Sequence, residues 1–345
     1  MKSFYEFYRQ VREDTIGQKD PIPLSKVNAQ TAQAAMDSGQ NDGNPQDDMV
    51  QVGKFDGPAM KLKPSQKEII LVKAFNMAMN TTVCGGKFPP GGELGSIVSA
   101  DNFIMDGHHR WAATLLVAPS ASIQAAQIPL PGEKVVSLLN VYTAGKKGPN
   151  AGQAGTGEIS EFTGENIQRM IIDVAQQNGK SPDSPDGKAP GFTFEDLQAR
   201  LAKLGNGDFN AGLAAVKANA DNLPKQLPGW APNRVDMPVV TPEELPDLMK
   251  KLQAGSLDHE NPYSPEVQQT MGGAKPAGAP AAPGAPAAAP GAPRAPAAPA
   301  APAAPGAPQQ AWSTNDGPTV MEQVLILSGI VTTEDVENSR KKRRR

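Results

Sequence analysis

The chain has 345 residues, of which 33 are Lys or Arg and 36 are Asp or Glu, so its net charge of −3 indicates no particular partner. Hydrophobic residues make up only 39%, and Gly and Pro contribute 34 residues each, which excludes a folded core that uses the whole chain. A single cysteine, Cys84, excludes an internal disulfide and a zinc site built from several cysteines. The sequence contains neither a membrane-length apolar run nor a leader peptide, so we expect no membrane association.

Residues 1–60 are expected to form a short amphipathic helix followed by a disordered segment. Aromatic and apolar side chains recur at helical spacing over residues 2–13, which predicts the helix. Over residues 16–60, Gln, Asn, Asp and Gly predominate. The few apolar residues there cannot bury enough surface to offset the entropy that ordering the chain would cost.

Residues 61–143 alternate helical and strand patterns, which predicts a small α+β domain. Ser65 and Glu68 fit a capping box at the start of its first helix. Two short apolar runs then flank a cluster of turn residues, as in a β-hairpin. The expected elements are a helix at 66–79, strands at 95–99 and 103–105, a helix at 108–117, a strand at 122–128 and a helix at 133–141.

The rest of the chain is expected to contain a helical region, a linker and a small helical hairpin. Helical spacing and capping residues predict a mainly helical region over 158–260. Frequent proline makes 272–310 an Ala/Pro-rich linker, because proline fixes φ and removes the backbone donor. Residues 318–345 are expected to form the hairpin and end in a basic tip. The expected helices of the middle region span 164–177, 194–204, 209–220 and 242–254.

The basic tip concentrates positive charge at the end of an otherwise acidic chain. It carries six positive charges, so the other residues together carry −9. Blocks of like charge stay solvated and bind phosphate polymers, and we therefore expect the tip to bind nucleic acid without sequence preference. The tip consists of Arg340, Lys341, Lys342, Arg343, Arg344 and Arg345.

The most distinctive local feature is the run Ile104–Ala113, where an apolar strand ends, Gly107 permits a tight turn and a helix begins. Unpaired N–H groups in the first turn of a helix and the helix dipole favour an anion. Arg110 can add a bidentate contact, so Gly107 and Arg110 are the candidate phosphate-binding residues. His108 and His109, two of only three histidines in the chain, are candidates for acid or base catalysis near neutral pH.

The sequence DGHHRWAA at 106–113 follows an apolar strand, with an upstream helix beginning PSQ and a strand and helix downstream. In this pattern, residues 61–143 resemble the ParB/sulfiredoxin superfamily, and in particular the ParB-like nuclease domains with a DGHHR motif that occur in phage proteins. The resemblance implies a small α+β fold in which the turn from Gly107 to Arg110 holds nucleotide or DNA phosphate.

The sequence differs from two better-known branches of the superfamily at motif positions, and these differences limit the activities that the resemblance implies. Sulfiredoxins place a reactive cysteine directly after this glycine, where His108 stands here, so sulfiredoxin chemistry is not expected. ParB partition proteins carry Gly-Glu-Arg-Arg and a further arginine two positions on, where Ala112 stands here, so a CTP-dependent partition clamp is not expected either.

Free serine kinases of the same superfamily also carry Gly-His-His-Arg, and similarity to them implies phosphoryl transfer. In that interpretation, Asp106 binds Mg²⁺ or Mn²⁺ or orients a nucleophile. His108 or His109 acts as acid or base, and Arg110 stabilises charge on the transferred group. The candidate nucleotides are ATP, ADP and CTP.

The first ten residues, MKSFYEFYRQ, resemble the amphipathic N-termini that target proteins into tailed-phage proheads. This resemblance implies that residues 1–15 attach the protein to a capsid or prohead, and that it occurs in the host cytoplasm or the virion. Three functions stay open. The first is a phage-type ParB-like protein that binds nucleotide or DNA phosphate, with metal-dependent nuclease activity as one version. The others are a virion or packaging DNA-binding protein without catalysis, and a nucleotide-dependent small-molecule kinase.

Overall fold

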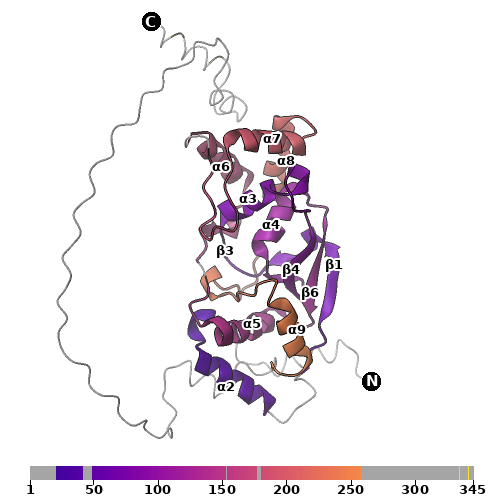
Figure 1. The fold of residues 1–345 in the computed structure, drawn as a ribbon, viewed down its shortest axis with the longest axis vertical. Helices are drawn as coiled ribbons and strands as arrows, with labels where there is room; N and C mark the ends of the chain where they lie inside the picture. Colours follow the sequence, from indigo (N-terminus) through magenta and orange to yellow (C-terminus); the bar gives the residue numbers. More distant parts are fainter. Residues whose placement is uncertain are drawn as a thin grey trace, which may run out of the picture.

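The computed structural model describes most of the chain between residues 21 and 257 (Figure 1). The described ranges are 21–41, 49–152, 154–176 and 180–257, with the single residues Glu334 and Lys341. The helix expected at 2–13, the linker at 272–310 and most of the hairpin at 318–345 lie outside the described residues. Within the described ranges, no helix has the length and apolar character that crossing a membrane requires.

A mixed five-stranded sheet, in the order β1-β6-β4-β5-β2, lies at the centre of the fold. Its strands are β1 (Gly53–Pro58), β2 (Lys63–Pro64), β4 (Gly92–Ser99), β5 (Phe103–Asp106) and β6 (Ser122–Ile128). The pairs β1/β6 and β4/β5 are antiparallel, whereas β4/β6 and β2/β5 are parallel. A separate antiparallel pair joins β3 (Glu68–Ile69) to β7 (Gly157–Glu158). The hairpin expected from two apolar runs is confirmed as β4 and β5.

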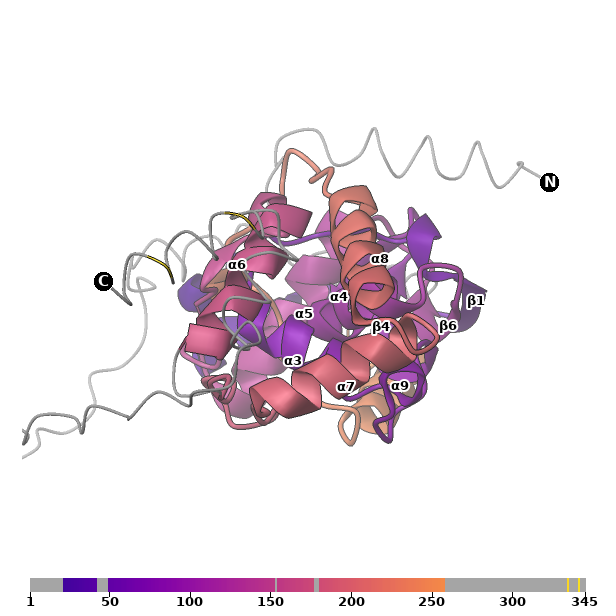
Figure 2. The ribbon, with the colours of Figure 1, turned by 90° about the horizontal axis from the view of Figure 1, so that it is seen from above.

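Helices cover both faces of the sheet. The α-helices are α2 (Ala29–Gln40), α3 (Leu71–Met79), α4 (His108–Val117), α5 (Gly132–Lys147), α6 (Gly164–Gln176), α7 (Phe194–Leu204), α8 (Phe209–Asn222) and α9 (Leu245–Gln253). The short 3₁₀ turns are η1 (Leu24–Lys26), η2 (Ala59–Lys61), η3 (Thr82–Cys84), η4 (Ile159–Glu161) and η5 (Arg234–Asp236). Helices α3 and α4 lie on one face, and α5 and α9 lie on the other (Figure 1). Figure 2 shows α7 and α8 lying over α3 and α4.

Alternation along the strands explains these layers. Val98 and Ile104 belong to the hydrophobic cluster that includes α3, α4 and α6 to α8. Their neighbours Ile97 and Met105 belong to the cluster that includes α5 and α9, because successive strand residues point to opposite faces. Trp111 of α4 is fully buried in the first cluster and donates its Nε1–H to the carbonyl oxygen of Ala59 at 3.0 Å. The helical region and the α+β domain therefore share one core.

The expectation that residues 16–60 are disordered is wrong for the part that the structure describes. Strand β1 pairs with β6 along its whole length, from Gly53 opposite Gln127 to Pro58 opposite Ser122. Helix α2 packs against α5 through buried alanines. Neither element has a strong local pattern, since β1 buries only Phe55 and α2 is rich in polar residues. Both are stabilised by partners that are distant in the sequence.

Most other expected elements are confirmed, with corrections at helix ends. Helix α3 begins at Leu71 rather than at residue 66, and Ser65 does not cap it, because its Oγ donates to the carbonyl oxygen of Ile104 at 2.6 Å. Helix α5 continues to Lys147. The expected helix at 242–254 begins later, at Leu245. Helices α4, α6, α7 and α8 and strand β6 lie within two residues of the expected bounds.

Candidate functional site

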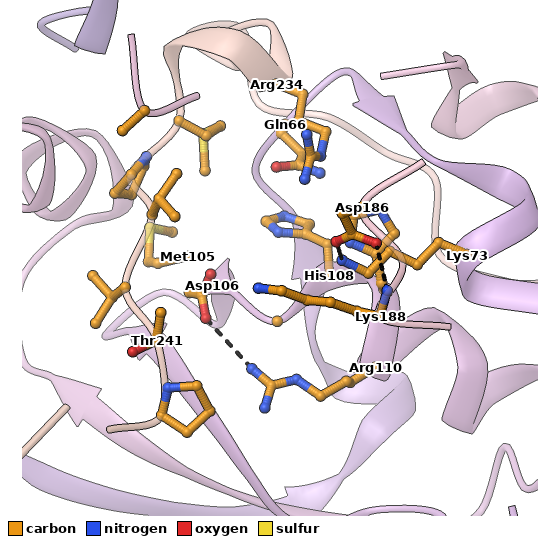
Figure 3. A pocket seen from close by; sticks show the side chains of 18 of the residues that line it. Gln66, Lys73, Met105, Asp106, His108, Arg110, Asp186, Lys188, Arg234 and Thr241 are labelled. Atoms are coloured by element: carbon orange, nitrogen blue, oxygen red, sulfur yellow. Dashed lines mark hydrogen bonds and ion pairs between the residues drawn. The ribbon is translucent and has the colours of Figure 1, made fainter. Parts of the chain in front are cut away.

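The turn from Gly107 to Arg110 opens onto a cavity of about 430 Å³ (Figure 3). Its other walls come from segments far apart in the sequence. Lys73 extends from α3, residues 186–188 precede α7, and Arg234 of η5 is followed by residues 237–243. The strand β5, the start of α4 and these segments, together with Gln66 and Ala151, therefore line one space.

Gly107 fits its position for two reasons. It precedes α4 with a φ of 94°, in the left-handed region that side chains disfavour. A Cβ atom at this position would also lie 2.1 Å from Oγ of Ser96 on the neighbouring strand β4. That hydroxyl is buried and has no hydrogen-bond partner within the described part of the chain. A larger residue at 107 would therefore force the hydroxyl of Ser96, β4 or the turn to shift.

His108 is a buried hydrogen-bond acceptor. Its Nε2 lies 3.2 Å from the backbone nitrogen of Ser65, whose N–H donates to it. Burial, together with the charge of Arg234, lowers the pKa of His108 to about 3. Because Nε2 accepts a hydrogen bond, the neutral ring carries its proton on Nδ1. His108 can therefore donate one hydrogen bond without adding charge to the cavity.

His109 makes an equivalent contact with a backbone N–H group that lies further along the chain than Ser65. Its Nε2 accepts a hydrogen bond of 3.1 Å from the backbone N–H of Ile70, directly before α3. Burial lowers the pKa of His109 well below its ordinary value, and the positive charges of Arg234 and Lys73 add to this effect. Acid or base catalysis by His108 and His109 stays a prediction, and these pKa directions favour hydrogen bonding by neutral rings instead.

The side chains of Asp106 and Arg110 face each other beside the turn that begins α4. Nη2 of Arg110 lies 3.5 Å from Oδ2 of Asp106, and the two side chains are 26% and 22% exposed. Burial raises the pKa of Asp106 to about 6, although Arg110 and the backbone N–H of Gly107 partly offset this rise. Asp106 does not cap α4, because no side chain does. The pKa of Asp106 therefore lies closer to neutrality than that of an ordinary aspartate.

Three further basic side chains line the cavity, and no pattern in the sequence predicts them there. Lys73 forms an ion pair with Asp186. Burial opposes ionisation of Asp186, but hydrogen bonds from Lys73 and Ser184 outweigh it and hold the pKa of this carboxyl below its ordinary value. The backbone N–H of Lys188 donates to Oδ1 of Asp186 at 3.2 Å, and this hydrogen bond fixes the backbone of Lys188. Its side chain reaches towards Asp106 and His108 (Figure 3).

Arg234 is the fourth basic residue of the cavity. Burial lowers its pKa, while the carboxylates of Asp186 and Asp106 counteract the shift. Lys73, Lys188 and Arg234 belong to no motif in the sequence, so only the folded chain brings them to Arg110.

The described residues do not fit a metal site held by the protein alone. Within the described ranges, no group of three or more His, Cys, Asp or Glu side chains lies close enough to hold an ion. Asp106 faces Arg110, and Asp186 is engaged by Lys73. Mg²⁺ or Mn²⁺ at Asp106 stays a prediction, in which the ligand's phosphate would have to supply most of the coordination.

Comparisons with protein-family models, with curated proteins and with solved structures gave no match for this chain. The α+β fold is confirmed by the sheet and helices. The resemblance of residues 61–143 to the ParB/sulfiredoxin superfamily stays a prediction from the DGHHR sequence. Of the basic tip, the structure describes only Lys341, which is helical and exposed.

Proposed function

We propose that this protein binds the phosphate of a nucleotide or nucleic acid at the turn from Gly107 to Arg110. The observation that carries the proposal is the convergence of four basic side chains on one cavity at the start of α4, in a chain of net negative charge. These side chains are Lys73, Arg110, Lys188 and Arg234.

Each group of the cavity has a distinct part in binding. The first N–H groups of α4 lack partners within the helix and can donate to phosphate oxygens. Nδ1–H of His108 adds a neutral donor beside them. Arg110 can exchange its long contact with Asp106 for a bidentate contact with phosphate, and Lys188 supplies a point charge. A hydrogen bond to a charged group contributes about 1.5–3 kcal/mol, so loss of one should weaken binding about 10- to 100-fold.

The binding test uses a matched pair of arginine variants. Arg110→Ala should weaken binding of ATP, ADP or CTP at least about tenfold in equilibrium titrations, because it removes a charged donor. Arg169→Ala is the control, since Arg169 lies on α6 with a 64% exposed side chain paired to Glu165. Equal affinities of the wild type and Arg110→Ala for every nucleotide and for short single-stranded DNA would refute the proposal.

A phosphoryl-transfer or nuclease activity is a second candidate, and the pKa of Asp106 favours it. A general base works best with a pKa near the working pH, and a carboxyl with a pKa of about 6 meets that need better than the neutral histidines. We would follow plasmid nicking and phosphate release from nucleotides with Mg²⁺ or Mn²⁺. Activity that disappears in Asp106→Asn while nucleotide affinity persists would support catalysis. If the wild-type protein shows neither activity, phosphate binding without catalysis is the proposed function.

The virion DNA-binding alternative predicts a different pattern. In that version, deletion of residues 340–345 abolishes DNA binding and Arg110→Ala has no effect on it. If the cavity binds the phosphate, nucleotide binding should survive the deletion and fail in Arg110→Ala.

A further inference from the structure

A second, larger cavity of about 820 Å³ adjoins the first one. Met77, Arg110 and Lys188 line both cavities, so the two spaces meet at these residues. The other walls of the second cavity come from the loop at 80–91 between α3 and β4, from α4, from residues 189–190 and from Arg200 of α7.

The two cavities differ in chemical character. The first contains charges of both signs, including Asp106 and Asp186. The second combines apolar walls with basic residues at its edges, and no acidic residue occurs among the described residues that line it. Its basic residues are Lys87, Arg110, Lys188 and Arg200, and its apolar walls include Met77, Phe88, Pro89, Ala113 and Pro190.

Phe88 is an aromatic side chain presented to solvent at the edge of this cavity, with 67% of its surface exposed. Backbone hydrogen bonds order the loop that carries it. The N–H groups of Lys87 and Phe88 donate to the carbonyl oxygen of Asn80, and the N–H of Thr82 donates to the carbonyl oxygen of Phe88 at 2.7 Å. The N–H of Gly91 donates to Oγ1 of Thr114 on α4 at 3.1 Å. The exposed ring is therefore held on a fixed backbone.

Arg200 supplies a positive charge whose position is also fixed. Its Nη1 donates to Oδ1 of Asn80 at 3.0 Å and to the carbonyl oxygen of Met79 at 3.3 Å. Its guanidinium lies over the ring of Phe192 at 5.0 Å from the centroid. The part of the cavity wall that Arg200 forms is therefore basic and held in place.

We propose that the second cavity takes the base and sugar of a nucleoside phosphate whose phosphate lies between Arg110 and Lys188. This inference rests on the proposed function and specifies its ligand. The two basic residues shared by the cavities, Arg110 and Lys188, favour a phosphate at the junction, and the apolar walls suit the flat base on the far side. An exposed aromatic ring is a stacking platform for any base, because every base has a π face. The chain's acidic charge outside the basic tip favours a mononucleotide over a long single strand.

The experiment separates the base from the rest of the ligand. Wild type and Phe88→Ala are titrated with AMP, GMP, CMP and UMP, and with ribose 5-phosphate, which has the same sugar and phosphate without a base. At least one nucleotide should bind the wild type about tenfold more tightly than ribose 5-phosphate, the size expected for stacking on one ring. Phe88→Ala should remove most of that preference and leave the affinity for ribose 5-phosphate unchanged, whereas Phe88→Tyr should keep it.

Two controls make the outcomes distinct. Met60→Ala truncates another exposed apolar side chain, 40% exposed and outside both cavities, and should change neither affinity. Equal binding of ribose 5-phosphate and all four nucleotides to the wild type, abolished by Arg110→Ala, would overturn this inference and spare the proposed function. Binding that does not need Arg110 would overturn both. A third outcome is that single-stranded DNA binds in a manner that requires Phe88, whereas the mononucleotides do not bind. That result would overturn the proposal of a nucleoside phosphate and assign the cavity to nucleic acid.

Discussion

Nε2 of His109 accepts a hydrogen bond from the backbone N–H of Ile70 over 3.1 Å, and so ties the start of α4 to the start of α3. His108 makes a parallel contact with the N–H of Ser65. In the sequence, each of these two adjacent histidines is a candidate for acid or base catalysis. In the structure, both rings use Nε2 to satisfy buried backbone donors of the segment that leads into α3. The pKa of each ring is lowered by burial and by the nearby positive charge of Arg234, which keeps both rings neutral.

Truncation of His109 should destabilise the protein. His109→Ala leaves the buried N–H of Ile70 without its acceptor, which costs about 1–3 kcal/mol of unfolding free energy. His109→Gln, whose amide oxygen can accept a hydrogen bond, should lose less. Urea denaturation of the three proteins checks the order. Equal stability of wild type and His109→Ala would contradict the structural role.

Acid should destabilise the fold through His108. Its folded pKa of about 3 lies below the ordinary value of 6.5, so the unfolded chain binds more protons between these values. The unfolding free energy therefore falls as pH falls below 6.5, by about 2 kcal/mol from pH 7.5 to pH 5 for this residue. His108→Asn should show a shallower decline in denaturation curves over that range. Parallel declines in both proteins would count against a buried neutral imidazole.

Ionisation of Asp106 should have the opposite effect on stability, because it lowers the unfolding free energy as pH rises. Its folded pKa of about 6 lies above the ordinary 3.8, so the folded state binds more protons between these values and stability falls as pH rises through 6. Asp106→Asn should be more stable than wild type at pH 7.5, on the order of 2 kcal/mol, and the difference should vanish near pH 4. Thermal unfolding at the two pH values tests this. A less stable variant at pH 7.5 would be the contrary result.

The same carboxylate should weaken phosphate binding when it ionises. For a phosphodiester, whose own charge is constant, affinity should fall as pH rises from 5.5 to 7.5, because Asp106 becomes negative beside the ligand. Asp106→Asn should bind more tightly at pH 7.5 and show little dependence on pH. Titration calorimetry with a dinucleotide provides the measurement, and an identical pH dependence in both proteins would exclude Asp106 from the site.

A side chain at residue 107 should destabilise the protein more when Ser96 is present. Gly107→Ala adds strain at a φ of 94° and a 2.1 Å contact with Oγ of Ser96, whereas Gly207→Ala, at a φ of 102° with no atom within 4 Å, adds strain alone. Gly207→Ala should cost about 1 kcal/mol and Gly107→Ala clearly more. Ser96→Ala should be nearly neutral, because it removes a buried hydroxyl without a partner, and should rescue part of the Gly107→Ala loss. Strict additivity of the two changes would contradict the contact.

The predictable part of this fold depends on contacts that are local in the sequence. Strand β5, Gly107 and α4 follow one another directly, so the turn and its candidate residues could be identified from their pattern. Strand β1 could not, because its residues alternate poorly and it is stabilised by pairing with β6. Lys188 and Arg234 reach the cavity only after the helical region packs on the sheet, and no spacing in the sequence connects them to Arg110.

The histidines show a different limit. The sequence gives their identity and their place in the first turn of a helix, but a catalytic role depends on protonation. Protonation depends on burial and on the charge of Arg234, and the fold determines both. Residue type therefore indicates where candidate side chains lie along the chain, but not their protonation in the folded protein.

The most direct test of phosphate binding at this turn is amide chemical-shift mapping of the full chain during titration with ADP. If the turn binds phosphate, the largest saturable shifts should occur at the backbone N–H groups of His108, His109 and Arg110, and Arg110→Ala should strongly reduce them. Shifts confined to residues 340–345, or no shifts at millimolar ADP, would contradict phosphate binding at this turn.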